Sequence, residues 1–445
     1  MLTLRPYQQL AVDQIRGAFK QGTTSLILCA PTGSGKTVTF SYIAKHAVSR
    51  GKRVMIVVNR KELLNQSVDK LNKYGLFPTV IAPGHKQEYN LCYVASVDTL
   101  HRRTLPLIDL VIFDEAHIQT FDKIIDRYKK LGVMGLGIPY FIGATATPFR
   151  SGSQRGLDEC YDAIIEPVKI QELIDDRHLV KARYFGAQRD FSRLKKKGGD
   201  FDNHALMHVF GSPEMYDGVV KQHKRFSQDG PTICFNVNQD HSEATTEKFK
   251  SEGFTSASVT SRTSSKDRVR IFRDFEAGLI DVLNNCGIAT TGYDNPGIRN
   301  TIINRATTSL PLHLQMPGRG SRPDVGKEAF HVIDMGSNIF RLGRWHENRE
   351  WSLEKKRKQK SDGVAPIKEC VSCGSLIHSS KALCEFCGMI QPKNEKKLLV
   401  SEFTEVKEMA NRKVTGKMNM RELHAYAKEK GYKSGWVHHQ FKNRR

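Results

Sequence analysis

Residues 33–37 form a loop that could bind phosphate. The loop lies between an apolar run at 25–30 and an amphipathic stretch at 37–48, and it reads Gly33, Ser34, Gly35, Lys36 and Thr37. Glycine lets backbone N–H groups approach phosphate oxygens, and the N-terminus of a following helix adds a favourable field. We expect Lys36 to reach the β and γ phosphates of a nucleotide and Thr37 to bind Mg²⁺. The strict pattern GxxxxGK[ST] fails at Ala30, so a glycine-rich loop formed by chance is the alternative.

Two adjacent carboxylates follow another apolar run. Asp114 and Glu115 end the segment LVIFDEA, and the carboxyl ends of parallel strands usually carry ligand contacts. Asp114 is expected to hold Mg²⁺, and Glu115 to orient and deprotonate an attacking water. Two acids after a strand are often only a surface turn. Their combination with the phosphate loop predicts ATP hydrolysis.

Four of the nine cysteines form two CxxC pairs, Cys370, Cys373, Cys384 and Cys387. Four thiolates bind Zn²⁺ tetrahedrally and leave no open position for water, so we expect a structural zinc ribbon rather than a catalytic metal. A redox dithiol would need a βαβ setting, whereas these pairs follow a charged stretch. His378 is expected to be a solvated loop residue. The other cysteines are scattered, which is typical of a reducing compartment.

The elements that must position these residues follow an alternation along the chain. Short apolar runs alternate with amphipathic stretches from residue 25 to about 150, and again from about 230 to 335. This pattern predicts βα units on two parallel sheets, each buried on both faces. The stretch 191–218 between the two series carries a cluster of lysines and glycines. We expect a loop there, followed by a helical segment that leads into the second series.

The chain length of 445 residues is consistent with about three domains. A polar, charged stretch precedes the cysteines, and a helical pattern follows them at 419–432. We predict an α/β protein made of a first α/β domain at 1–178, a second at 179–345, a charged linker at 346–366, a zinc ribbon at 367–392 and a basic helical tail at 393–445.

The charge of the chain is strongly positive. It holds 69 lysines and arginines against 47 acidic residues, a net charge of +22, and about half of the excess lies beyond residue 340. Such a field attracts polyanions, so nucleic acid is the expected partner, although a lysine-rich tail can also be simply solvated. No apolar run approaches membrane-spanning length, and the N-terminus does not resemble a signal peptide. We expect a cytoplasmic monomer that does not enter a membrane.

The order of these motifs resembles that of superfamily 2 helicases of the DEAH-box type. The phosphate loop of that superfamily has the pattern AxxGxGKT, which accommodates Ala30. Its DEAH box matches the acid pair and extends to His117. The segment LRPYQ resembles the Q motif, in which Arg5 would flank the adenine and Gln8 would read its edge. The resemblance implies two RecA-like domains that use ATP and Mg²⁺.

Motifs later in the chain extend the resemblance. TTGYDNP resembles motif V, and QMPGRGSR fits motif VI. Taken alone, Arg319 and Arg322 would be surface cations, but in this order they are expected to act with Gln315 as catalytic residues. A guanidinium brought from a second domain can neutralise charge that develops on the γ-phosphoryl group. The residues expected to bind ATP and its Mg²⁺ are Arg5, Gln8, Thr32, Gly33, Ser34, Gly35, Lys36, Thr37, Asp114, His117, Gly292 and Asp294.

The remaining motifs point to nucleic acid. NRKELLNQ and ASVDTL resemble motifs Ia and Ib, which grip the nucleic-acid backbone. In GATATPFR, which resembles motif III, Thr145 and Thr147 would connect His117 to the nucleic-acid side. The residues expected to contact nucleic acid are Arg60, Ser96, Thr99 and Thr291.

A closer resemblance, to the RadD-type branch of bacterial and phage helicases, rests on VIDMGSNIFRLG, the four cysteines and KGYKSGWVHHQFK. It implies an ATP-dependent DNA helicase or translocase of repair, recombination or replication. Its partners would be single-stranded, forked or branched DNA and a single-stranded-DNA-binding protein. The zinc module would fix the basic tail and present Lys381 and Phe386 to nucleic acid. An RNA helicase and the motor subunit of a restriction-type nuclease stay open. A zinc-dependent binding protein with a degenerate ATPase fits the complete motor residues less well.

Overall fold

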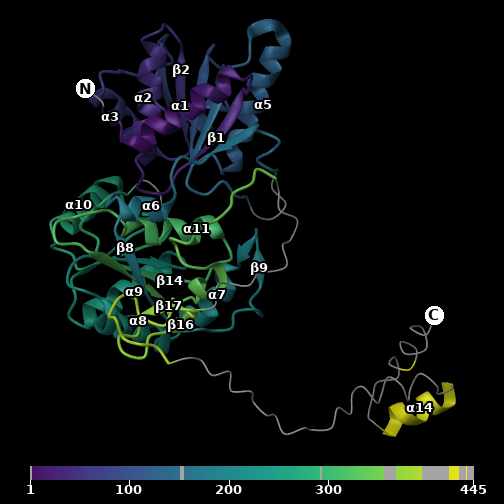
Figure 1. The fold of residues 1–445 in the computed structure, drawn as a ribbon, viewed down its shortest axis with the longest axis vertical. Coiled ribbons are helices and arrows are strands. Elements are labelled where there is room, and N and C mark those ends of the chain that lie inside the picture. Colours follow the sequence, from purple (N-terminus) through teal and green to yellow (C-terminus); the bar gives the residue numbers. More distant parts are fainter. Residues whose placement is uncertain are drawn as a thin grey trace. The chain divides into compact units, whose positions relative to one another are not determined.

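The computed structural model describes residues 3–150, 155–290, 293–354, 367–392, 420–429 and 437. The chain divides into two compact units, residues 1–389 and 390–445. The first unit contains two large parallel sheets, which form the two lobes seen in Figure 1. The predicted α/β fold with two tandem parallel-sheet domains is therefore confirmed.

The first sheet has seven parallel strands in the order β3-β4-β2-β5-β6-β1-β7. Strands β1, β2 and β5 are buried at every residue, as expected for a sheet covered by helices on both faces. The strands are β1 Ser25–Cys29, β2 Val54–Val58, β3 Thr79–Ile81, β4 Cys92–Ser96, β5 Leu110–Asp114, β6 Tyr140–Thr145 and β7 Ala163–Ile165. The helices include α1 Pro6–Lys20, α2 Lys36–Val48, α3 Lys61–Lys73, α4 Val97–Leu100 and α5 Asp122–Leu131.

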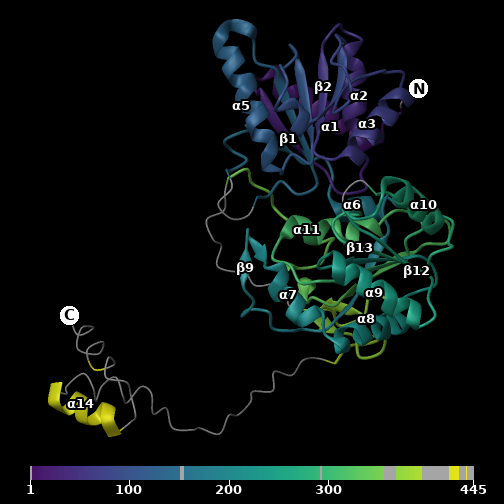
Figure 2. The same cartoon turned by 180° about the vertical axis from the view of Figure 1, so that it is seen from behind.

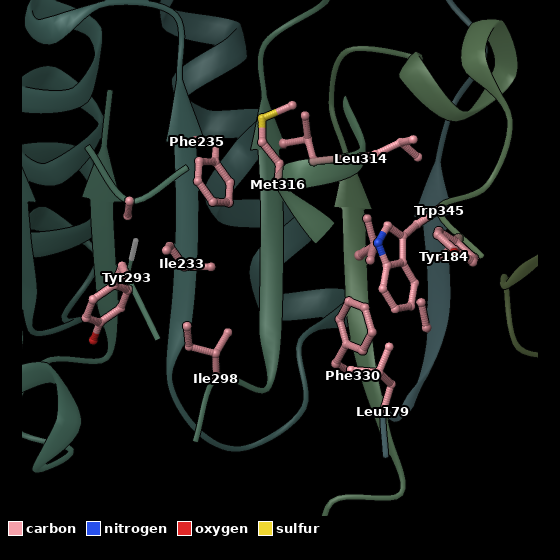
Figure 3. Packing of buried hydrophobic residues seen from close by; sticks show 14 of the residues in the cluster. Leu179, Tyr184, Ile233, Phe235, Tyr293, Ile298, Leu314, Met316, Phe330 and Trp345 are labelled. Carbon is pink, nitrogen blue, oxygen red and sulfur yellow. The ribbon is translucent and has the colours of Figure 1, made fainter. Parts of the chain in front are cut away.

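The second sheet has six parallel strands in the order β12-β13-β11-β14-β15-β8. The strands are β8 Lys181–Gly186, β11 Thr232–Asn236, β12 Ser256–Val259, β13 Val282–Asn285, β14 Asn300–Asn304 and β15 Ala329–Asp334. The helices include α6 Ile170–Asp175, α7 Asn203–Phe210, α8 Pro213–Phe226, α9 Gln239–Ser251, α10 Ser265–Glu276, α11 Leu310–Gln315 and α12 Asn338–Leu342. Figure 3 shows its core, where Trp345 meets Phe330 edge to face with ring centroids 5.7 Å apart.

The connection between the sheets begins after β7 and ends before β8, so the predicted boundary at 178/179 falls within it. The first part of the segment predicted as a linker, 346–366, packs against the rest of the protein. Trp351 packs against the cores of both sheets, and the Leu353 carbonyl accepts a hydrogen bond from the Asp158 N–H at 3.3 Å. Trp351 and Leu353 therefore contact the first domain, His346 stays with the second through a hydrogen bond to Tyr184, and 355–366 lie outside the described residues.

The lysine- and glycine-rich stretch predicted as a loop contains a small antiparallel hairpin. Its strands are β9 Lys196–Lys197 and β10 Asp200–Phe201, and the helices α7 and α8 follow. Gly198 and Gly199 connect the strands with positive φ angles of 62° and 89°, which glycine adopts without steric cost. The predicted lead-in helices are confirmed, and the preceding loop is more ordered than its composition suggested.

The cysteine module packs onto the second domain. Its strands β16 Ile367–Glu369 and β17 Leu376–His378 form an antiparallel pair, and Leu376 joins the core of the second sheet. The Arg183 guanidinium donates to the Ser375 hydroxyl at 2.5 Å and lies over the Phe386 ring at 5.6 Å. Phe386 therefore faces an arginine of the same chain, and His378 lies in a strand rather than in the expected loop.

The second unit contains α14 Met420–Glu429, which matches the helical pattern predicted at 419–432. The other residues of the predicted tail, apart from Val437, lie outside the described residues, and so does most of the segment KGYKSGWVHHQFK. Within the described ranges, no helix combines the length and apolar character needed to cross a bilayer.

Candidate ATP site between the two sheets

The predicted phosphate loop connects β1 to α2 at the carboxyl edge of the first sheet. Gly33 and Gly35 adopt φ angles of 94° and 80°, a region that other residues rarely occupy. The Lys36 ammonium donates hydrogen bonds to the Ala30 and Pro31 carbonyls at 3.1 and 3.3 Å. Burial lowers the pKa of Lys36, whereas the nearby acid pair raises it. Lys36 thus lies over the loop beside the two carboxyl groups, and Thr37 follows it in the first turn of α2.

The N-terminal segment braces this loop. The Tyr7 hydroxyl and the Gln8 side-chain amide both donate to the Ser34 carbonyl, at 2.8 and 3.0 Å. The Gln8 side-chain oxygen accepts from the Arg5 N–H at 3.0 Å, and the Arg5 guanidinium donates to Tyr7 at 3.2 Å. The segment predicted to recognise adenine is therefore joined to the phosphate loop. Tyr7 was missed in the sequence, although it lies between the two residues that were chosen.

The acid pair lies at the end of β5. Glu115 has a φ of 58°, unusual for a residue with a side chain, and its N–H donates to the Asp114 carboxylate at 3.1 Å. Burial, reinforced by the Glu115 charge, raises the pKa of Asp114 to about 7. His117 Nδ1 lies 2.9 Å from the Thr145 hydroxyl and 3.4 Å from the Glu115 carboxylate. Burial lowers the pKa of His117, whose imidazole connects Glu115 to β6.

Thr147, the second threonine chosen from this segment, is also buried, and its N–H donates to the Thr145 hydroxyl at 3.1 Å. Arg150 then fixes the loop that carries the acid pair. Its guanidinium forms a buried ion pair with Asp122 at 2.8 Å and donates to the carbonyls of residues 116–118. Arg150 is the last residue of the segment GATATPFR, and no local pattern in that segment predicts this role.

Arg322 brings the second domain to the phosphate loop. Its guanidinium donates to the Gly33 carbonyl at 3.1 Å and pairs with Asp294 at 3.0 Å. The same approach is visible at Gly318, where an added Cβ would lie 3.1 Å from the Thr32 side chain. Thr32 and Gly33 of the first domain therefore contact the arginine segment of the second.

Arg319 has a different position. It is buried, and its guanidinium donates to the Thr290 and Tyr293 carbonyls at 2.7 and 2.6 Å. Burial, together with the Arg322 charge, lowers the pKa of Arg319 to about 10, so it stays protonated at neutral pH. Arg319 thus holds the two ends of the motif V loop, whose Thr291 and Gly292 lie outside the described residues.

Several polar side-chain atoms in this region are buried and form no hydrogen bond, which is unusual because buried polar groups normally find hydrogen-bond partners. In the part of the chain that the structure describes, they include Ser34 Oγ, Glu115 Oε2 and Gln315 Nε2. They come from the phosphate loop, the acid pair and the arginine segment. A nucleotide with its attacking water would supply partners for these atoms, so the residues present fit such a ligand.

Comparison with known proteins agrees with this geometry. A family described as "Type III restriction enzyme, res subunit" matches residues 1–150, and a second, described as "Helicase conserved C-terminal domain", matches residues 216–324. One family match therefore falls on each of the two parallel-sheet domains. The first match covers the phosphate loop and acid pair, and the second covers both arginines.

Two relatives match most of this chain. A 51.5 kDa protein of a Lactococcus phage is 29% identical over 387 residues, which are 84% of this chain and 80% of the phage protein. The putative ATP-dependent helicase IRC3 of Saccharomyces cerevisiae is 32% identical over 356 residues, 74% of this chain and 51% of the yeast protein. The chain therefore spans about half the length of the yeast relative.

A solved structure shares the fold of this chain. It is the fragment of a putative HsdR subunit of a type I restriction enzyme from Vibrio vulnificus, at a TM-score of 0.57 and 22% identity. The match covers 76% of this chain and 65% of that fragment.

Three of the four residues predicted to contact nucleic acid lie along the carboxyl edge of the first sheet, and the fourth, Thr291, lies outside the described residues. Arg60 precedes α3 and Ser96 precedes α4, and these helices follow the neighbouring parallel strands β2 and β4. Thr99 lies within α4 and is half-buried. The Arg60 guanidinium donates to the Gly287 carbonyl of the second domain at 2.7 Å. Arg60 therefore joins the two domains as well as marking the predicted nucleic-acid edge.

The four cysteines of the two CxxC pairs lie together. Their sulfur atoms are all within 4.8 Å of one another, and the Cys370–Cys387 and Cys373–Cys384 pairs are each 3.7 Å apart. Tetrahedral Zn²⁺ with bonds of about 2.3 Å places its sulfur ligands about 3.8 Å apart. The donor set and its spacing therefore fit zinc.

Proposed function

We propose that this protein is an ATP-dependent DNA helicase or translocase. The observation that carries the proposal is the hydrogen bond from Arg322 to the Gly33 carbonyl, which brings an arginine of one sheet to the phosphate loop of the other. A guanidinium in this position can stabilise charge on a transferring phosphoryl group. The same contact lets the state of the nucleotide control the distance between the domains.

The roles within the site follow from its geometry. Lys36 would exchange its two carbonyl partners for phosphate oxygens, and Thr37 and Asp114 would hold Mg²⁺, which screens phosphate charge when bound. Glu115, whose Oε2 is buried and forms no hydrogen bond, would accept a proton from the attacking water. His117 orients Glu115 and connects it to Thr145. Gln315 and Arg322 would complete the site from the second domain.

Movement along a strand would come from the cleft. With ATP bound, Arg322 and the phosphates attract each other, and after hydrolysis this attraction weakens. The ion pair with Asp294 gives Arg322 a second partner when the phosphate contact is lost. Alternate closing and opening of the two sheets would then step Arg60, Ser96 and Thr99 along the nucleic-acid backbone.

The finer assignments belong to the same proposal. We propose DNA as the track, because the net charge of +22 favours a polyanion and the resemblance to the RadD-type branch favours DNA repair. Zinc at the four cysteines would hold the module against the second domain. RNA is the competing track, since phosphate contacts do not report the sugar.

A second candidate is the motor subunit of a restriction-type nuclease. The match of residues 1–150 to a restriction-enzyme subunit family favours it, as does the fold shared with the HsdR fragment. Incubation of a supercoiled plasmid with the protein, ATP and Mg²⁺ tests it, because cutting or nicking would support the nuclease assignment.

The principal experiment is ATPase turnover with single-stranded, duplex and forked DNA and with matched RNA. We expect stimulation by DNA, and Glu115→Gln is expected to lower turnover about 10²- to 10⁴-fold because it removes the general base. Glu172→Gln changes an exposed carboxylate and serves as the control. Full turnover in Glu115→Gln, or no stimulation by any nucleic acid, would contradict the proposal.

A further inference from the structure

The basic hairpin of the second domain has no part in the site described above. Residues 193–201 contain four exposed cations, Arg193, Lys195, Lys196 and Lys197. Within the described ranges, none of these four side chains forms an ion pair with a carboxylate. Lys196 lies over the Phe201 ring at 5.8 Å. Their charge is therefore available to a partner from outside.

The only acidic residue within 193–201 is turned inward. The Asp200 carboxylate accepts hydrogen bonds from the Thr307 hydroxyl and the Thr308 N–H, each at 2.6 Å, and lies 3.7 Å from Arg305. The Thr308 hydroxyl also donates to the Gly199 carbonyl at 3.0 Å. These contacts hold the tip of the hairpin against the segment that follows β14, so Asp200 does not neutralise the lysines.

The base of the hairpin is anchored in the core. Phe201 and Phe191 are buried, their ring centroids are 6.4 Å apart, and the Arg341 guanidinium lies 5.5 and 5.2 Å from them. The Asp202 N–H closes the hairpin by donating to the Lys195 carbonyl at 2.8 Å. A run of lysines that is only solvated would need neither the hydrogen bonds at the tip of the hairpin nor the buried aromatic rings at its base. The structure thus presents these cations from an ordered support.

The hairpin lies at the edge of the second sheet that the first domain approaches. Thr307 follows the carboxyl end of β14, and β13, parallel in the same sheet, ends just before Gly287. The Gly287 carbonyl accepts the hydrogen bond from Arg60, which lies on the predicted nucleic-acid edge of the first domain. In Figures 1 and 2 the strand β9 stands beside α7, on the flank of the second lobe opposite α10. A strand passing Arg60 and Gly287 could continue across this carboxyl edge to the hairpin.

We propose that the hairpin of residues 193–201 is a further contact for the nucleic-acid backbone. This inference rests on the proposed function and extends the predicted track across the second domain. The recognised chemistry is the phosphodiester chain without sequence preference, because lysine ammonium groups act as point charges and read no base edge. Binding through the hairpin is accordingly sensitive to salt.

The test compares two triple variants by fluorescence anisotropy with a labelled 30-nucleotide oligo-dT, without ATP, over a range of salt concentrations. Lys195→Ala/Lys196→Ala/Lys197→Ala removes the hairpin charge. Lys20→Ala/Lys45→Ala/Lys52→Ala removes the same charge from exposed lysines of the first domain, where Lys20 and Lys52 precede β1 and β2 and so lie away from the carboxyl edge. Thermal melting followed by circular dichroism checks that both variants fold.

The hairpin variant is expected to bind at least tenfold more weakly than wild type at about 50 mM salt. Its plot of log affinity against log salt should become shallower by about 2, at about 0.7 per lost phosphate contact. The control variant should stay close to wild type. Wild-type affinity and slope in the hairpin variant, with DNA-stimulated ATPase in wild type, would overturn this inference alone. Absence of that stimulation in wild type would count against the proposed function itself.

Discussion

The two sheets share one strand topology but differ in what their strands contain. Strands β1, β2 and β5 of the first sheet are almost wholly apolar until the carboxyl end, where the chemistry begins. The central strands of the second sheet, β11, β13 and β14, carry fully buried asparagines at Asn236, Asn284, Asn285, Asn300 and Asn304. Parallel strands buried on both faces normally read as apolar runs, so the second sheet is the exception.

Three asparagines of the second sheet form hydrogen bonds with one another. The Asn236 amide donates to Asn284 at 3.0 Å, and the Asn304 amide donates to Asn236 at 2.9 Å. The Thr245 hydroxyl of α9 adds a bond to Asn236 at 3.1 Å. This network joins three adjacent strands to a helix. Such a buried network favours one arrangement of the sheet, at the cost of sensitivity to any change that removes a partner.

The difference teaches how the site divides its tasks. The first sheet ends in groups that would hold phosphate, metal and water, and its apolar strands need only support them. The second sheet contributes cations, namely Arg319, Arg322 and the lysines of the hairpin. These cations must be held in place while part of their charge stays free to attract phosphate. Buried polar strands and arginine-to-carbonyl bonds supply that support. The following predictions test this division, beginning with the largest expected effect.

Arg322 should matter for chemistry and Arg319 for both chemistry and structure. Arg322→Ala is expected to lower nucleic-acid-stimulated ATP turnover by about 10³-fold or more, the range seen for arginines that stabilise phosphoryl transfer. Arg319→Ala should also lower stability, because its two buried carbonyl contacts are lost. Turnover and guanidinium denaturation measure the two effects. Arg262→Ala, an exposed arginine, is the control, and turnover within threefold of wild type in Arg322→Ala would break the comparison.

Acid should unfold the second domain first. Burial lowers the pKa of His223, His241 and His313 to about 4 and that of His346 to about 3, whereas these residues titrate near 6.5 when unfolded. The folded domain keeps these histidines neutral. Their contribution to the stability of the second domain is therefore fully present above about pH 6.5 and is lost as the pH drops toward 4. At pH 5.5 the loss is roughly 1 kcal/mol for each histidine, or about 4 kcal/mol together.

The first domain should resist acid better, because among its described residues His117 is the one largely buried histidine whose pKa is lowered. A buried carboxyl with a raised pKa opposes the trend in each domain, Asp114 in the first and Asp334 in the second, so these two roughly cancel. Hydrogen exchange measured by mass spectrometry between pH 7 and 5 separates the two domains. Equal loss of protection in β5 and β11 would contradict this expectation.

Metal removal should affect the second domain and spare the first. Cys373→Ser, or a chelator, is expected to lower the stability of the second domain by roughly 3 kcal/mol, because Leu376 loses its burial and the module loses its metal. Denaturation with domain-resolved hydrogen exchange is the measurement. A chelator added to Cys373→Ser should have no further effect. If the chelator destabilised both domains equally, the module would have a wider role than its contacts indicate.

The smallest effect tests the asparagine network itself. Thr245→Val removes the hydroxyl bonded to Asn236 and should cost about 1 kcal/mol more than Thr246→Val. Thr246 is its buried neighbour on α9, and its hydroxyl bonds only the Ser242 carbonyl within the helix. Urea denaturation of both variants gives the difference. Equal values would mean that the threonine contributes nothing to the network.

Local patterns predicted much of this fold. The phosphate loop, the acid pair and the four cysteines each depend on residues close together in the chain, and alternation of apolar runs predicted both parallel sheets. The bond between Arg322 and Gly33 joins residues 289 positions apart, so only the resemblance to a family suggested it. Docking of the cysteine module depends on Leu376 and Arg183, which no local spacing distinguishes. The asparagines in β11 and β14 resemble ordinary strand ends until the neighbouring strands are known.

Trp351 gives the junction of the domains a natural spectroscopic label. It is one of three tryptophans in the chain, and its side chain packs against the cores of both sheets. Indole emission shifts to longer wavelength when water gains access to the ring. Separation of the sheets would expose Trp351 while Trp345 stays in the core of the second sheet. Comparing wild type with Trp351→Phe would therefore let intrinsic fluorescence follow opening of the cleft without any attached dye.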